Sequence, residues 1–372
     1  MAKLGEVCEV LDSKRVPITA ANRVSGQYPY YGANGVQDYV ADYIFDDELV
    51  LLAEDGGNFG SKEKPIAYRV SGKCWVNNHA HVLKPKAVID VDYLCYSLMF
   101  YDVSGLVNGA TRQKLTQSDM RKMEIPLRTM VEQKNIVCRL NKLTELISLR
   151  KQQLAKLDEL VKARFVEMFG DMLLNSLGWS EKPLECLANI VSGITKGRKT
   201  AETDLLEVPY MAVSNVKNGY IDWTTVKTIL ATRQEIEQYR LLPDDILMTE
   251  GGDPDKVGRG AIIKNPLENS IHQNHIFRVR LDESELLPSF FAEYLQHQKA
   301  KRYFLGCAKQ TTGIASINMR QLKSLPVLLP PLSLQNDFAT FVERVDQQKQ
   351  TVQQSLEKLE LMKKALMQEY FG

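Results

Sequence analysis

Two stretches of the chain place apolar residues at alternating intervals of four and three. The first runs from about 133 to 169, and the second has the same length near the end of the sequence. A stripe with this spacing is typical of a helix that packs along another helix in a coiled coil. The positions predicted to form the interface of this helix pair are Ile136, Leu140, Leu143, Ile147, Leu154, Leu157, Val161, Phe338, Val342, Val345, Val352, Leu356, Leu359 and Leu366.

The pattern also predicts what covers these stripes. Neither run contains Pro or Gly, so each predicts one uninterrupted helix, roughly 55 Å long at 1.5 Å per residue. Burial of a Leu or Ile side chain contributes ~1.5–3 kcal/mol, so an exposed stripe strongly favours a partner helix. A coiled coil between two copies of the chain would show the same pattern. Another feature of the sequence is needed to distinguish such a dimer from a helix pair within one chain.

An internal repeat favours the internal pair. Residues 115–170 align on 317–372 without a gap, at a constant shift of 202 residues (317 − 115 = 202). Gln133 and Gln335 are one of several identical pairs, and both copies end in Phe-Gly. A fixed register held over this length indicates a duplication.

The remaining sequence predicts two mixed α and β globules. In the first, we expect a buried strand over 48–53, strands over 66–70 and 74–76, and a helix over 92–103. In the second, we expect one helix over 287–304. The predicted fold class is therefore α/β (α+β), with globule and long helix alternating in domains 1–130, 131–170, 171–183 (a linker), 184–332 and 333–372.

Composition is that of an ordinary globular protein, with 44% hydrophobic and 25% charged residues. No run of 18 apolar residues predicts a membrane helix, and the first residues lack an apolar signal core. The six cysteines are scattered without a Cys-x-x-Cys pair, which favours free thiols in a reducing compartment. We therefore expect a cytoplasmic protein.

The net charge of +1 gives no indication of nucleic-acid binding. A DNA-binding surface would have to be a local basic patch.

Several kinds of catalytic chemistry find no support in the sequence. Residues 56–62 place Ser before Lys, the reverse of the order that a phosphate-binding P-loop needs. No methyltransferase motif and no pairing of a nucleophile with a base is readable. His79 with His81, and His272 with His275, could ligate a metal, but no third ligand is spaced nearby, so we expect no metal. The sequence favours a binding protein without an active site or cofactor of its own.

Polar loops of both globules carry the residue types that read DNA. Direct readout uses Arg, Lys, Asn and Gln on loops or helices held by a rigid scaffold. The alternative reading of each residue is a solvated loop position or a side chain that satisfies its own turn. The candidate DNA-binding residues are Asn58, Ser61, Lys62, Asn77, Asn78, His79, Arg112, Gln113, Lys114, Lys196, Arg198, Lys199, Lys217, Lys256, Arg259, Gln273, Asn274, His275, Lys309, Gln310, Thr311 and Thr312. Asn77, Asn78 and His79 are expected at places equivalent to Gln273, Asn274 and His275.

The ordered set of these features resembles a known family. The duplicated helix, the stretch Lys162-Ala-Arg-Phe-Val-Glu-Met-Phe-Gly-Asp171, the stretch Tyr28-Pro-Tyr-Tyr-Gly-Ala-Asn-Gly35 and the loop over 250–260 are similar to the specificity subunits of type I restriction–modification systems. The resemblance covers essentially the whole chain.

The resemblance implies two target-recognition domains separated by two long antiparallel coiled-coil helices, with pseudo-twofold internal symmetry. It implies partners as well: double-stranded DNA, two modification (methyltransferase) subunits and restriction (translocase/nuclease) subunits, with no membrane. S-adenosylmethionine, ATP and magnesium would belong to those subunits, and this chain would select the sequence that they methylate or cleave.

Two different globules should read two different half-sites, so we expect an asymmetric bipartite DNA site with an unread gap. Modules that read one face of a duplex sit ~34–36 Å apart, a span that a helix pair of roughly 55 Å can cover. The competing hypothesis is a coiled-coil scaffold with two protein-binding modules and no DNA reading, which the neutral charge suits.

Overall fold

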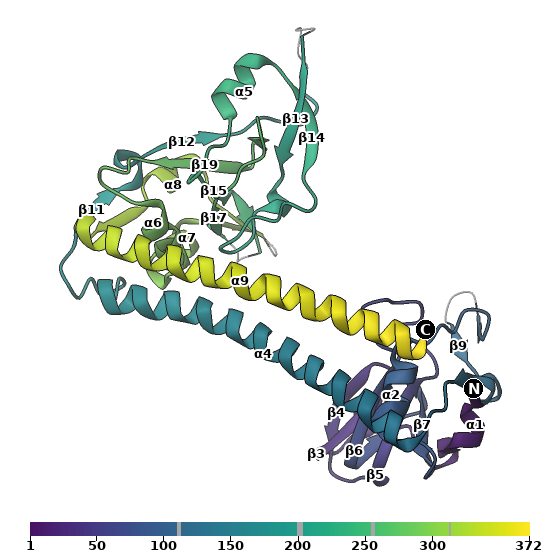
Figure 1. Ribbon diagram of the computed structural model, residues 1–372. Coiled ribbons are helices and arrows are strands. Elements are labelled where there is room, and N and C mark those ends of the chain that lie inside the picture. The colour runs from purple at the N-terminus through teal and green to yellow at the C-terminus, as the bar shows by residue number, and fades with distance from the viewer. Residues whose placement is uncertain (110–112, 199–203, 254–256, 312–313) are drawn as a thin grey trace. The chain divides into compact units, whose positions relative to one another are not determined.

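The computed structural model describes residues 1–109, 113–198, 204–253, 257–311 and 314–372. It divides into two compact units. Unit 1 comprises Met1–Gln152 and Gln353–Gly372, and unit 2 comprises Gln153–Val352. Each unit contains one globule together with part of each long helix, as the colours of Figure 1 allow the reader to follow.

The long helices are α4 (Met130–Phe169) and α9 (Leu332–Phe371), each of 40 residues. Their first residues differ by 202 (332 − 130) and so do their last (371 − 169), which is the shift of the sequence repeat. The prediction of two uninterrupted, duplicated helices is confirmed. Within the described residues, no helix has both the length and the apolar character needed to cross a membrane.

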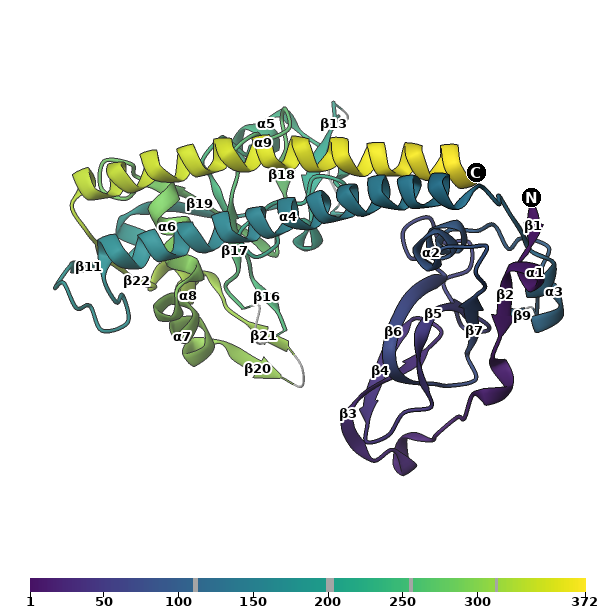
Figure 2. The same cartoon turned by 60° about the horizontal axis from the view of Figure 1, so that its bottom comes forward.

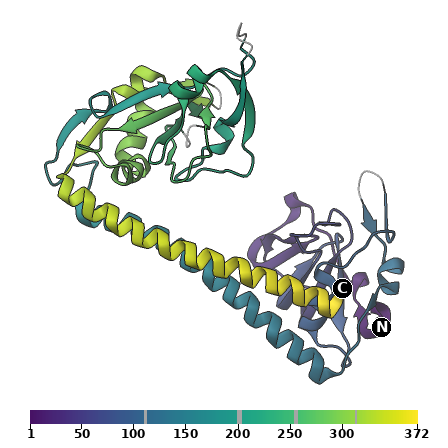
Figure 3. The same ribbon diagram turned by 45° about the horizontal axis from the view of Figure 1, so that its top comes forward.

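Within each unit, α4 and α9 pack against each other in opposite directions (Figure 3). In unit 1, Arg139 Nη1 donates to the Tyr370 hydroxyl at 3.1 Å, and Lys151 Nζ lies 2.8 Å from a Glu360 carboxylate oxygen. In unit 2, Lys349 Nζ lies 2.5 Å from Asp158. Residue numbers rise along one helix as they fall along the other, so the internal antiparallel pair is confirmed.

The apolar stripe faces the interior of the helix pair along its whole length. Of the fourteen predicted interface positions, Ile147, Leu154, Val342, Leu359 and Leu366 are half-buried and the other nine are buried. Phe165 and Phe169, which the seven-residue pattern left out, are 2% and 1% exposed. They widen the stripe at the end of α4 because that end packs on the second globule as well as on α9.

The first globule is built on one six-stranded sheet, ordered β2-β7-β5-β6-β3-β4 (Figure 2). All neighbours are antiparallel except β3 and β6. Its elements are β1 (Ala2–Lys3), α1 (Leu4–Val7), β2 (Cys8–Val10), β3 (Ser25–Gly32), β4 (Gly35–Val40), β5 (Phe45–Ala53), β6 (Ala67–Val76), β7 (Ala80–Pro85), α2 (Val91–Met99), β8 (Val107–Asn108), β9 (Lys114–Leu115), α3 (Gln117–Lys122) and β10 (Glu124–Ile125).

The second half of β5 is buried on both faces, which explains the continuous apolar run over 49–53. Val50 and Leu52 belong to the core that includes α2, and Leu49 and Leu51 belong to the core on the opposite face. The helix expected over 92–103 is shorter than predicted: α2 begins after its N-cap Asp90 and ends at Met99. The Asp90 carboxylate accepts from two backbone N–H groups of the first turn, which fixes the start of the helix.

The second globule repeats this sheet with a break. Its strands form the orders β12-β19-β15-β17 and β14-β13-β18, which match β2-β7-β5-β6 and β4-β3-β6. The single ten-residue strand β6 therefore corresponds to β17 and β18 together. The separate strands expected over 66–70 and 74–76 were wrong, because that segment pairs with β5 without interruption.

The elements of the second globule are β11 (Ser180–Pro183), β12 (Ala188–Ser192), β13 (Leu206–Met211), β14 (Lys227–Ala231), α5 (Arg233–Tyr239), β15 (Ile246–Thr249), β16 (Gly251–Gly252), β17 (Gly260–Ile262), β18 (Ile271–His272), β19 (Ile276–Leu281), α6 (Pro288–Gln296), α7 (Gln298–Cys307), β20 (Lys309–Thr311), β21 (Ile314–Ser316), α8 (Met319–Lys323) and β22 (Pro326–Leu329). The prediction of one helix over 287–304 was wrong. His297 has extended backbone angles (φ −75°, ψ 154°), and its ring accepts from the Lys299 N–H to start α7 as a separate helix.

A buried glutamine ties each long helix to its globule in the same way. Gln133 Oε1 accepts from the Asp90 N–H at 2.8 Å, and its Nε2 donates to the Val88 and Arg128 carbonyls. Gln335 Oε1 accepts from the Leu287 N–H at 2.8 Å, and its Nε2 likewise donates to two carbonyls. Both glutamines are 0% exposed. The duplication therefore includes the connection of α2 to α4 in the first half and the equivalent connection of α6 to α9 in the second.

Candidate nucleic-acid interface

Three predicted loops of the first globule meet at Glu54, where β5 ends and the glycine-rich loop begins. The Glu54 N–H donates to the His79 carbonyl at 2.9 Å, and the Leu115 N–H donates to the Glu54 carbonyl at 2.8 Å. The glycine-rich loop, the segment 77–79 and the turn that precedes β9 are thus joined by backbone hydrogen bonds.

The second globule repeats this junction at Glu250. The Glu250 N–H donates to the His275 carbonyl at 3.0 Å, and the Ile317 N–H donates to the Glu250 carbonyl at 2.8 Å. The Asn274 N–H also donates to the Ile194 carbonyl, which brings the basic loop after β12 to the same place.

The strand register fixes which residues correspond. Tyr31 pairs with Val76 on β6, and Met211 pairs with His272 on β18, both in parallel ladders. The residues that follow, 77–79 and 273–275, therefore occupy equivalent places, as the sequence predicted. The same backbone position therefore carries Asn-Asn-His in the first globule and Gln-Asn-His in the second.

At each junction a carboxylate holds the last residue of this segment. His79 Nδ1 lies 2.6 Å from Asp55 Oδ1, and His275 Nδ1 lies 2.6 Å from Glu250 Oε2. The acid comes from neighbouring rather than identical positions of the repeat, and each pair fixes the orientation of its imidazole ring. His275 keeps 56% of its side chain exposed.

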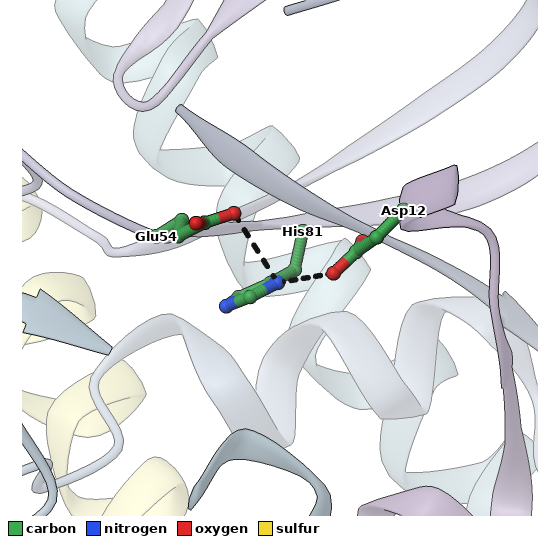
Figure 4. A group of neighbouring side chains, drawn as sticks. All are labelled: Asp12, Glu54 and His81. Carbon is green, nitrogen blue, oxygen red and sulfur yellow. Dashed lines mark hydrogen bonds and ion pairs between the residues drawn. The ribbon is translucent and has the colours of Figure 1, made fainter. Parts of the chain in front are cut away.

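Behind the first junction lies a buried charged cluster of Asp12, Glu54 and His81 (Figure 4). The expectation that His81 has no third potential metal ligand near it was wrong, because the fold brings these residues together from distant parts of the chain. Protein cations already neutralise the carboxylates: Arg15 Nη1 lies 2.5 Å from Glu54 Oε2 and Lys114 Nζ lies 2.9 Å from Glu54 Oε1. The His81 nitrogens contact Asp12 Oδ2 at 2.6 Å and the Leu115 carbonyl at 2.9 Å. The cluster is therefore a network of ion pairs that fixes the junction.

The two carboxyl groups of this network are held in their charged form. Burial alone raises the pKa of Asp12, but the hydrogen bond and charge of His81 outweigh it and lower the pKa below its ordinary value. Burial likewise raises the pKa of Glu54, and its bonds to Arg15 and Lys114 lower it further than burial raises it.

A depressed carboxyl pKa makes the network a source of acid sensitivity. Its contribution to the stability of unit 1 is present above the ordinary values of 3.8 and 4.5 and is lost as pH falls through the lower folded-state pKa values. We expect Glu54→Gln to destabilise unit 1 at pH 7, and the difference from the unchanged protein to shrink as pH falls through the lowered folded-state pKa of Glu54. Hydrogen exchange of the amides of β5 and β7 over a series of falling pH values measures this difference, and a difference that stays constant would contradict the assignment.

Several other candidates serve the fold. Ser61 Oγ accepts from two N–H groups of its own turn, and Asn58 Nδ2 contacts the Pro65 carbonyl at 3.4 Å. Lys114 pairs with Glu54, and both Arg198 and Gln273 are bonded within the second globule, Arg198 to Glu235 and Gln273 to the Val213 N–H. The contacts of these residues therefore support a role in holding the fold rather than a role in contacting DNA.

The remaining candidates divide by exposure. Exposed side chains that could reach a ligand are Lys62, Asn78, Gln113, Lys196, His275 and Lys309, and the half-buried ones are Lys217, Arg259 and Asn274. Gln310 and Thr311 lie in β20, which pairs with β21 (Figure 2). Arg112, Lys199, Lys256 and Thr312 lie outside the described residues.

The structure adds residues that the sequence did not single out. A hollow of about 380 Å³ in the first globule is lined by Asn77, Asn78 and His79 together with Arg23 and Gln37. Neither Arg23 nor Gln37 belongs to a loop with a recognisable motif, and only the pairing of β3 with both β4 and β6 brings them to the junction.

The comparisons with known proteins point to one family. A family model described as the type I restriction modification DNA specificity domain matches residues 1–159 and 177–361. A type I restriction enzyme specificity subunit of Haemophilus influenzae is 27% identical over 92% of this chain and 86% of its own length. The specificity subunit of the EcoKI enzyme of Escherichia coli is 23% identical over 81% of this chain and 67% of its own length.

The fold has a solved counterpart. The crystal structure of the S subunit of a type I restriction–modification system from M. genitalium covers 100% of this chain and 95% of its own, with a TM-score of 0.60 at 16% identity. The family model matches the two halves of the chain in turn, so that the duplicated frame, with its two different sets of polar side chains, lies within the matched residues. The chain belongs to the family of type I restriction–modification DNA specificity subunits.

Proposed function

We propose that this chain reads an asymmetric bipartite DNA site, one half-site with each globule. The observation that carries the proposal is the pair of equivalent junctions, at Glu54 and Glu250. Each is held by the same backbone hydrogen bonds, yet each presents a different set of polar side chains. One scaffold with two different surfaces suits two different half-sites, because base edges are read by side chains while the scaffold only positions them.

We further propose that the chemistry belongs to partner subunits. Two modification subunits with S-adenosylmethionine, and restriction subunits with ATP and magnesium, would methylate or cleave the DNA that this chain selects. Exposed apolar side chains on the helices support a docking role. Leu160 on α4 and Met362 on α9 are equivalent in the repeat (362 − 160 = 202), and both are exposed. Two equivalent positions suit two copies of one partner.

A genome-wide map of methylated bases tests this function, in a host that carries the complete complex and in the same host with this gene deleted. We expect one split motif to disappear on deletion, and that motif gives both half-sites and the gap. If the same motifs remain without the gene, the chain does not direct methylation, and the proposal is rejected.

Arg259 is the residue of the second globule whose contribution we expect to be specific to one half-site. It is half-buried beside β15, and its Nε atom is buried without a hydrogen-bond partner among the described residues. Arg259→Ala should reduce discrimination in the second half-site by ~1–3 kcal/mol if Arg259 contacts a base. Binding to DNA variants changed in either half-site measures this effect, and a uniform loss on all sequences would identify a phosphate contact instead.

A further inference from the structure

The hollow at the first junction contains a side-chain amide whose orientation the fold has fixed. Asn77, at the end of β6, is 2% exposed. Its Oδ1 accepts from the His79 N–H at 2.8 Å, and its Nδ2 donates to Gln37 Oε1 at 3.0 Å. Because a backbone N–H can only donate, the first bond settles which end of the Asn77 amide is oxygen. The second bond then settles the same question for Gln37.

Gly32 leaves room for the Gln37 amide on its other side. A Cβ atom added to Gly32 would lie 2.2 Å from Gln37 Nε2 and 2.4 Å from its carboxamide carbon. The glutamine therefore lies directly over Gly32, where β3 turns into β4 and no side chain fits beneath it. The amide is positioned before any ligand arrives, which reduces the entropy lost on binding.

Gln37 itself remains open to a ligand. It is exposed and lines the hollow. Its Oε1 retains one lone pair, and its Nε2 makes no hydrogen bond to another residue in the part of the chain that the structure describes. It therefore presents one acceptor and one donor side by side. Arg23 is committed elsewhere: its guanidinium lies 4.3 Å from the Tyr30 ring centroid and bonds to Asp38 and to the Ile18 carbonyl.

We infer that Gln37 reads an adenine in the first half-site through the major groove. The inference rests on the proposed DNA-reading function and adds a residue and a base to it. Adenine presents the N6 amino group as a donor beside N7 as an acceptor, which matches the Oε1 and Nε2 of a glutamine. Guanine presents two acceptors, so its O6 would face the Gln37 oxygen. Asn77 is a positioning residue, because it acts through Gln37.

The second globule offers no equivalent glutamine. Tyr30 pairs with Asp38 and Tyr210 pairs with Lys227, so the position of Gln37 corresponds to Val226. Val226 packs against an apolar core. The effect of Gln37 should therefore be confined to one half-site.

The test uses the complex of this chain with its modification subunits and the split motif obtained from the methylation map. Binding is measured to duplexes in which each adenine of the first half-site is replaced in turn by 7-deazaadenine, which lacks N7, or by purine, which lacks the N6 amino group. At one adenine, both replacements should weaken binding by roughly 5- to 150-fold. Gln37→Ala should bind these analogues and natural DNA equally.

Gly32→Ala provides an independent variant. The added methyl group displaces the Gln37 amide without removing it, so discrimination at the same adenine should fall. Lys122→Ala, a change at an exposed residue of α3 in the same globule, is the control that keeps this discrimination.

The failure of this inference can be told apart from the failure of the proposed function. If the motif exists but its first half-site has no adenine sensitive to both analogues, or if Gln37→Ala stays sensitive to them, the assignment of Gln37 is overturned and the reading function stands. If deletion of the gene removes no motif, the function itself fails.

Discussion

Phe338→Ala lowers the free energy of unfolding of unit 2 by about 3–5 kcal/mol, the usual cost of removing a large aromatic side chain from a core. Phe338, on the first turns of α9, is 0% exposed. Its ring centroid lies 5.5 Å from that of Phe165 and 5.4 Å from that of Phe169, both on α4. Phe290 of α6 completes the cluster, 4.7 Å from Phe169. The expected loss is large because one side chain joins both helices to the globule.

Hydrogen exchange in urea measures this effect, with amides of unit 1 as the internal reference. Val166→Ala is the matched control within unit 2, since Val166 is 50% exposed on α4 and its truncation should change stability by less than about 0.5 kcal/mol. A cost below about 1 kcal/mol for Phe338→Ala would show that the aromatic cluster does not hold the helices to the globule.

Removing one heptad from each long helix should abolish methylation at the native gap length. The deletions are residues 147–153 of α4 and 357–363 of α9, which face each other in the antiparallel register. Seven residues shorten a helix by about 10.5 Å, which is about three base pairs of DNA at 3.4 Å per pair. A three-base-pair change also rotates one half-site by about 100° around a duplex of roughly 10.5 base pairs per turn. Both changes act against recognition of the original site.

The measurement is a methylation map of a host that carries the doubly shortened chain. We expect either a new motif with a shorter gap or no methylation at all. Because seven residues preserve the coiled-coil repeat, the variant should fold, which a thermal melt verifies. Deletion from α4 alone should instead destabilise the chain, since it moves the remaining seam out of register. Unchanged gap length in the double deletion would exclude the helices as the determinant of spacing.

The helix pair and the repeat could be predicted because they follow from local periodicity. Leu140 and Leu157 appear at intervals that only a helix converts into a stripe, and the constant shift of 202 residues needs no structure to detect. The break at His297 could not be predicted in this way. The apolar residues on either side of it continue a helical pattern, and it is the extended backbone of His297 that separates α6 from α7.

The candidate site was only partly predictable, for a related reason. Exposed loop positions such as Asn78 and His275 could be named from residue type and turn signals. Residue type alone could not separate a reader from a residue that positions it. Asn77 was expected to contact DNA, yet it is buried and bonded to Gln37, a residue that lies 40 positions away and has no motif around it.

The division of the chain into units has a consequence for its biosynthesis. Unit 1 includes Gln353–Gly372, which the ribosome produces 201 residues after Gln152 (353 − 152). At about 5–20 residues per second this interval lasts roughly 10–40 s. During it, Tyr93 lacks the Phe371 ring that lies 5.1 Å away in the finished protein, and the stripe around Leu140 has no partner. The globule that is synthesised first is therefore completed only after the second globule has been made, and the nascent chain exposes an apolar surface until α9 emerges.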